Sequence, residues 1–152
     1  MRSIYPHRQP LPFRRRVLAP SVVSGDVTAP VLSSPVGTAT GSSTATVGAT
    51  TDEGNGTLYA VVTVSGTAPT GTQVEAGQDN SGSAATWNGS QAIGSTGVKT
   101  IGATGLSAST AYYAHLMHKD AAGNRSNVVS SAQFTTDAAG GSKLLLQLMN
   151  MH

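Results

Sequence analysis

The chain has 152 residues, of which 38% are hydrophobic, 11% are charged and 5% are aromatic, and it contains no cysteine. This length allows one domain with a modest core plus terminal segments. The low charge excludes a charge-driven disordered chain, and a helical bundle would need much more Glu, Lys, Leu and Arg. The abundance of Gly, Ser, Thr and Ala therefore favours an all-β domain with many polar turns.

The N-terminal residues 1–27 form a segment of their own. They carry five of the nine basic residues and no acid before Asp26. The positive net charge of the chain, +2, therefore comes from this arm and not from a basic domain. Four prolines disfavour helix here, and apolar side chains such as Tyr5, Phe13 and Leu18 are spread between them. We interpret 1–27 as an extended, basic, Pro-rich arm that orders on another subunit; a floppy tail is the alternative. Its short apolar run ends at Pro20, which does not fit an export signal.

Residues 28–137 divide into short stretches typical of strands. An edge strand is expected at 31–35, where Pro35 is tolerated, and a second strand at 44–50. Asn-Gly at the end of 52–56 predicts a turn. The stretch 58–64 is apolar at both alternating sets of positions, which predicts a central strand covered on both sides or an outer face that meets a partner.

The second half of this region continues the pattern. The segment 72–77 is the one expected helical turn, and 79–97 forms either two short strands or a long loop. A short strand is expected at 98–103. The next strand, 112–119, has a clear inside and outside, and a last strand is predicted over 128–136.

Residues 138–152 combine a Gly-rich linker with an apolar tail. The tail is too short to span a bilayer, and no other apolar run approaches twenty residues, so no membrane partner is expected. An exposed tail of this kind would favour aggregation. We therefore expect it to dock into a groove or to add a strand to a sheet, its own or a neighbour's.

No pattern in the sequence indicates catalysis. His115 and His118 are three residues apart, so on a strand they point to opposite faces and cannot share a metal ion. Asp52, Glu53 and Asn55 are interpreted as a polar turn, because the loop lacks the oxygen ligands of a calcium site. No nucleophile elbow, phosphate-binding loop or paired-carboxylate pattern is present, so we expect no enzyme, no cofactor and no metal site.

The stretch from Leu106 to Asn124 carries a resemblance. Its run Gly-Leu-Ser-Ala-Ser-Thr-Ala-Tyr-Tyr and its Asp-Ala-Ala-Gly-Asn turn resemble fibronectin type III and related immunoglobulin-like domains. The resemblance implies a single β-sandwich over 28–137, with a tyrosine corner in which the Tyr112 hydroxyl returns to nearby backbone. The residues that define the fold would be Leu106, Tyr112, Leu116 and Gly123. The chain departs from the family in having Ala108 in place of Pro and no Trp in its second strand.

The Thr-, Ala- and Gly-rich composition of the domain is also similar to that of immunoglobulin-like modules of bacteriophage virion proteins. This resemblance implies a non-enzymatic structural or accessory protein of a phage virion, assembled in the host cytoplasm, with other virion proteins and further copies of itself as partners. The expected places are a capsid decoration, the neck, or a tail or fibre component. The Pro and aromatic setting of the arginines favours protein over nucleic acid as their partner. The residues expected to anchor the chain are Tyr5, Phe13, Arg14, Arg15, Arg16, Leu18, Leu144, Leu145, Leu146 and Leu148.

The alternative is a carbohydrate- or receptor-binding module of a cell-surface or secreted bacterial protein. Trp87 and Tyr59 would then form the recognition surface, with a host-surface glycan as a possible ligand. The simpler interpretation of Trp87 is packing on the sandwich, since a lone Trp is usually mostly buried.

Overall fold

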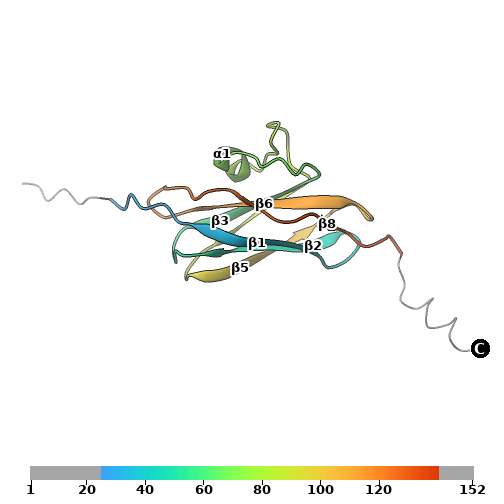
Figure 1. Ribbon diagram of the computed structural model, residues 1–152, viewed down its shortest axis with the longest axis horizontal. Helices are drawn as coiled ribbons and strands as arrows, with labels where there is room; N and C mark the ends of the chain where they lie inside the picture. The colour runs from blue at the N-terminus through green and yellow to red at the C-terminus, as the bar shows by residue number, and fades with distance from the viewer. Residues whose placement is uncertain (1–24, 141–152) are drawn as a thin grey trace, which may run out of the picture.

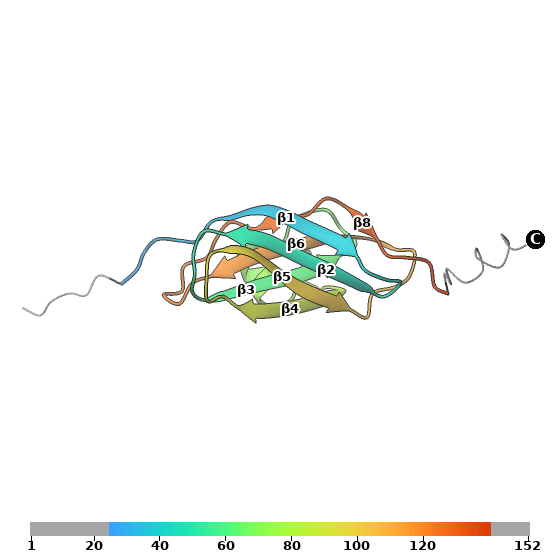
Figure 2. The ribbon, with the colours of Figure 1, turned by 90° about the horizontal axis from the view of Figure 1, so that it is seen from below.

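The computed structural model describes residues 25–140, which form two antiparallel sheets packed face to face (Figures 1 and 2). One sheet has three strands in the order β1-β2-β5, and the other has the order β4-β3-β6-β7, with β8 also paired to β6. The elements are β1 (Leu32–Ala39), β2 (Thr44–Thr51), β3 (Thr57–Thr63), α1 (Gly71–Glu75), β4 (Trp87–Ala92), β5 (Gly97–Thr104), β6 (Ala111–Lys119), β7 (Val129–Ser130) and β8 (Phe134–Thr135). The β-sandwich predicted from the sequence is confirmed.

Most predicted strands lie where the sequence pattern puts them, and one does not. The region 79–97, left open between two strands and a loop, contains the single named strand β4. The prediction of one continuous strand over 128–136 is wrong, because β7 and β8 are separate two-residue strands. The ladder breaks at Ser131, whose hydroxyl oxygen accepts the backbone N–H of Ala114 at 3.0 Å. Phe134 then turns inward and packs against Gly37 of β1.

The core lies between the sheets and is built by the alternation of each strand. β2 contributes Ala45, Val47 and Ala49, and β6 contributes Tyr112, Ala114 and Leu116, all at most 2% exposed. These two sets are every second residue of their strands, as expected for side chains on one face. Burial of such apolar surface is the main favourable term in the stability of the domain.

The four residues implied to define the fold lie along this core and at its end. The Tyr112 hydroxyl accepts a hydrogen bond from the backbone N–H of Ser107 at 3.1 Å, which is the return contact that the resemblance implies. Leu106 and Leu116 are buried in the same core cluster. Gly123 has φ of 100° in the turn after β6, a conformation that favours glycine.

The sheet that contains β3 and β6 is covered on both faces. Its inner face meets the other sheet, and its outer face is covered by α1 and the segments beside it (Figure 1). Val74 of α1 packs on Val61 of β3 and Met117 of β6 in a second apolar cluster. The central strand predicted at 58–64 is therefore covered on its outer side by a helix of the same chain.

The chain enters and leaves this domain at opposite ends of its long axis (Figures 1 and 2). Among residues 25–140, no helix has the length and apolar character needed to cross a membrane.

Candidate functional site

Acidic side chains from three distant parts of the chain meet at the end of the sandwich where the chain enters the domain. Carboxylate oxygens of Asp26, Glu53 and Asp120 all lie within 4.8 Å of one another. Beside them is a solvent-open hollow of about 390 Å³. Its lining residues are Asp26, Thr28, Ala29, Asp52, Glu53 and Asn55. We call the cluster of Asp26, Glu53 and Asp120 the acidic end.

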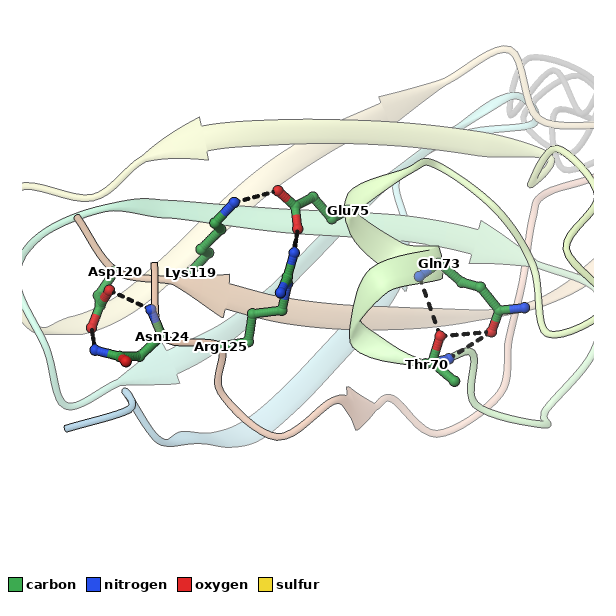
Figure 3. Close-up of polar contacts among 7 residues, drawn as sticks. All are labelled: Thr70, Gln73, Glu75, Lys119, Asp120, Asn124 and Arg125. Atoms are coloured by element: carbon green, nitrogen blue, oxygen red, sulfur yellow. Dashed lines mark hydrogen bonds and ion pairs between the residues drawn. The ribbon is translucent and has the colours of Figure 1, made fainter. Parts of the chain in front are cut away.

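Asn124 holds the acidic end together. Its backbone N–H and its side-chain amide donate to the two carboxylate oxygens of Asp120, at 2.8 and 2.7 Å (Figure 3). The same amide donates to the backbone carbonyls of Asp26 and Thr28, at 3.0 and 3.2 Å. The turn after β6 therefore fixes the segment that precedes β1, although these residues are almost a hundred positions apart.

The hydrogen bonds at this turn also limit what the acidic end can bind. Burial pushes the pKa of Asp120 up, but hydrogen bonds from Asn124, Gly123 and Ala122 outweigh it and hold the pKa below its ordinary value of 3.8. Because both oxygens of Asp120 already accept from Asn124, few oxygens remain for a cation that takes about six to eight of them. We assign no ion to this group. Sequence reasoning singled out Asp52, Glu53 and Asn55, but nothing in the pattern places Asp26 and Asp120 beside them.

The two histidines of β6 are completely buried on opposite faces of the strand. His118 faces the other sheet, where its Nδ1 lies 2.8 Å from the Thr51 hydroxyl and its Nε2 bonds to the Asn55 carbonyl. Since a carbonyl can only accept, Nε2 carries a proton and donates it to Asn55. His118 therefore joins β6 to β2 and to the loop after it.

His115 lies under the outer layer, and both of its ring nitrogens also have hydrogen-bond partners. Its Nδ1 is 2.7 Å from the Ser130 hydroxyl, and its Nε2 is 3.1 Å from the Thr63 hydroxyl and 3.2 Å from the Ser65 carbonyl. Burial disfavours the charged ring and lowers the pKa of His115, partly offset by the Ser65 carbonyl. The Ser130–His115 distance would suit a nucleophile and its base. However, the ring is fully buried and both nitrogens have partners, so the pair serves the packing of β6.

Trp87 and Tyr59 do not form one surface. Trp87 of β4 pairs in register with Val62, lies on the inner face and packs against the core while half-buried. Tyr59 is on the outer face of β3, half-buried against the cluster under α1. The structure therefore separates the two aromatic residues proposed for ligand recognition by the thickness of a sheet.

A short helix closes the outer face of the β3–β6 sheet through polar contacts at its end. Glu75 of α1 bridges Lys119 of β6, at 2.7 Å, and Arg125, whose Nε lies at 2.9 Å (Figure 3). The hydrogen bond from Lys119 is the largest of the effects that lower the pKa of Glu75. At the other end, Thr70 and Gln73 form a capping box that satisfies backbone donors of the first turn (Figure 3).

The outer face of the three-stranded sheet, in contrast, is covered by no described segment. Since Ala45, Val47 and Ala49 of β2 point into the core, the alternate residues of this sheet point outward. The outward positions, aligned by the register of β1, β2 and β5, carry no charge and are Ser33, Val36, Thr38, Thr44, Thr46, Gly48, Thr50, Val98, Thr100, Gly102 and Thr104. We call this set the threonine face.

Comparison with protein-family models and with curated proteins found no match for the chain. Membership in the fibronectin type III or immunoglobulin-like family therefore stays a prediction. The ten residues predicted to anchor the chain, from Tyr5 to Leu18 and from Leu144 to Leu148, all lie outside the described residues 25–140.

Proposed function

We propose that this chain is a non-enzymatic structural or accessory component of a larger assembly, a phage virion. In this role it displays an immunoglobulin-like domain and is held by its two terminal segments. The observation that carries the proposal is that the segments leave the described domain at opposite ends, so that neither competes with the other for a partner (Figure 1). The basic arm and the apolar tail then contact other proteins of the particle.

The chemistry of the described residues supports a non-enzymatic role. The imidazoles of His115 and His118 are fully buried and hydrogen-bonded inside the sandwich. The hollow at the acidic end holds polar side chains whose hydrogen bonds fix loops to one another. A rigid display domain needs such contacts between its loops.

Attachment at both ends has a geometric consequence. The chain enters and leaves the domain at opposite ends of its long axis (Figures 1 and 2). A domain fixed only at one end would project from the particle, whereas one fixed at both of these ends would lie with its long axis along the surface. One long side then faces the particle. The threonine face is the side best suited to this, because burying it desolvates no charge.

Full-length variants test the proposal. Arg14→Ser, Arg15→Ser and Arg16→Ser together remove the basic cluster of the arm, and Leu144→Ser, Leu146→Ser and Leu148→Ser remove apolar side chains of the tail. We expect each triple variant to fold normally by circular dichroism and to be reduced at least tenfold in purified particles, measured by mass spectrometry. Val64→Ser, which removes an exposed apolar side chain from the domain, is the matched control and should be incorporated normally. Normal incorporation of both triple variants would contradict the proposal.

A further inference from the structure

The free edge of β5 has one of the features that usually keep an edge strand from pairing, the charge of Lys99 at the inward position opposite Ala49, and it lacks the others. Of the other edge strands, β7 and β8 have only two residues each, and β1 is guarded by Pro35 and by an irregular register between Ser33 and Val36. β4 is short, with six residues that are mostly polar or glycine. β5 has eight residues with no proline and no register shift against β2. Its only charged residue, Lys99, donates to Ser95.

The side chains beside this edge are covered only in part. Ile101 of β5 and Trp87 of β4 both point inward and pack against the core, yet both remain half-buried. β4 and β5 are the outermost strands of their sheets on the same side of the sandwich (Figure 2). Val98, on the outer face of β5, is 70% exposed. A strand added to β5 would extend the three-stranded sheet and cover the open margin next to Trp87.

The chain carries one segment whose pattern fits this position. Residues 143–149 read Lys-Leu-Leu-Leu-Gln-Leu-Met and follow a Gly-rich link at 140–142, and these seven residues are one fewer than the eight of β5. In a strand, Leu144, Leu146 and Leu148 share one face. That face would supply three leucines to the margin beside Trp87 and Ile101.

The topology favours a tail from another copy over the chain's own tail. The backbone of Asp137 bonds to Gly41, in the β1–β2 turn, and to Ser109, in the β5–β6 loop. To reach the far edge of β5, the same chain would have to cross both of these connections at the end of the sandwich, and connections at one end of a sheet rarely cross. A tail that arrives from a neighbouring molecule meets no such obstacle.

We propose that residues 143–149 of one copy bind as an added strand to the free edge of β5 in a neighbouring copy. This inference rests on the proposed function, since it names the partner of the tail. Backbone hydrogen bonds along β5 would supply affinity, and the leucines beside Trp87 would set the register.

Purified full-length chain tests this inference without any particle. We expect association that rises with concentration in analytical ultracentrifugation, slow hydrogen exchange at the β5 amides in the associated form, and a blue shift in the fluorescence of the single tryptophan. The variant with Leu144→Ser, Leu146→Ser and Leu148→Ser should lose all three signals. The matched control with Leu145→Ser and Met149→Ser alters the other face of the tail and should retain the tryptophan shift.

A peptide of residues 141–152 separates the remaining outcomes. Added to the triple-leucine variant, it should protect the β5 amides and shift the Trp87 emission. Protection of β5 in a monomeric wild-type chain would overturn the inference, because the tail would then pair within its own molecule. So would a peptide without effect, or a triple variant that associates normally. If the purified wild-type chain does not associate but the triple-leucine variant is still missing from particles, the proposed function stands. A neighbouring copy is then not the partner of the tail.

Discussion

His118 and His115 occupy opposite faces of β6, and in each ring both nitrogens are hydrogen-bonded. His118 connects the two sheets at the acidic end, and His115 connects β6 to the outer layer. The alternation of the strand predicts that the two rings point in opposite directions. The partners Thr51, Asn55 and Ser130 come from other loops and strands, which no local pattern identifies.

Replacing His118 should lower the stability of the domain. His118→Leu leaves the Asn55 carbonyl and the Thr51 hydroxyl without their buried partner, and we expect a loss of about 2–4 kcal/mol in the free energy of unfolding. The midpoint of urea unfolding would fall with an unchanged slope. Thr100→Val, on the exposed outer face of β5, is the control and should change the midpoint little. An unchanged midpoint in His118→Leu would show that the bridge contributes nothing.

Burial of His115 should make stability depend on pH in a defined direction. Because its pKa is lowered in the folded chain, the unfolded chain takes up the proton first as the pH falls below the ordinary value of 6.5. Stability is therefore complete above about pH 6.5 and declines as the pH falls from there towards the lower, folded pKa. Urea unfolding at pH 7.5, 6.5 and 5.5 measures the slope. His115→Gln should lose less stability over this interval, and an identical slope in both proteins would refute the assignment.

Within the single strand β4, the missing side chain of Gly89 leaves space for the ring of Trp87. A Cβ added at Gly89 would lie 2.5 Å from the Trp87 ring, so the indole lies directly over this glycine. We expect Gly89→Ala to displace the ring, cost about 1–3 kcal/mol, and red-shift the emission of the only tryptophan. Gly94→Ala is the control, since no atom lies within 4 Å of its added Cβ. Equal spectra for the two variants would mean that the ring does not rest on Gly89.

The helix α1 allows apolar and ionic contributions to be compared within one element. Val74 is 2% exposed and packs on Val61 and Met117, so Val74→Ala should cost about 1–3 kcal/mol. Glu75→Gln breaks two ion pairs whose basic partners are 31% and 41% exposed, so solvent screening limits the loss to about 0.5–1 kcal/mol. The loss for Glu75→Gln should also shrink in high salt, while that for Val74→Ala should not. A larger loss for Glu75→Gln would reverse the assigned order of the two contributions.

For the molecule as a whole, composition predicted an all-β domain, alternation predicted individual strands and their buried faces, and the resemblance of the stretch 106–124 implied the sandwich. The strand at 44–50 and the two faces of 112–119 follow directly from the alternation. The acidic end could not be predicted, since Asp26, Glu53 and Asp120 belong to three loops that only tertiary structure brings together. The split at Ser131 was missed for the same reason, because a side-chain contact replaces a backbone bond there.

The contacts of the acidic end lead to a prediction about the domain boundary. Residues 25–140 contain both apolar clusters and all sheet pairings described, so this fragment should unfold in one transition with coincident fluorescence and circular dichroism signals. A fragment beginning at residue 32 loses the bonds of Asn124 to the Asp26 and Thr28 carbonyls and the bonds between Val31 and Asp52. Because these bonds are exposed, we expect a loss of about 1–2 kcal/mol without loss of the fold. If both fragments unfold at the same urea concentration, the segment before β1 is no part of the domain.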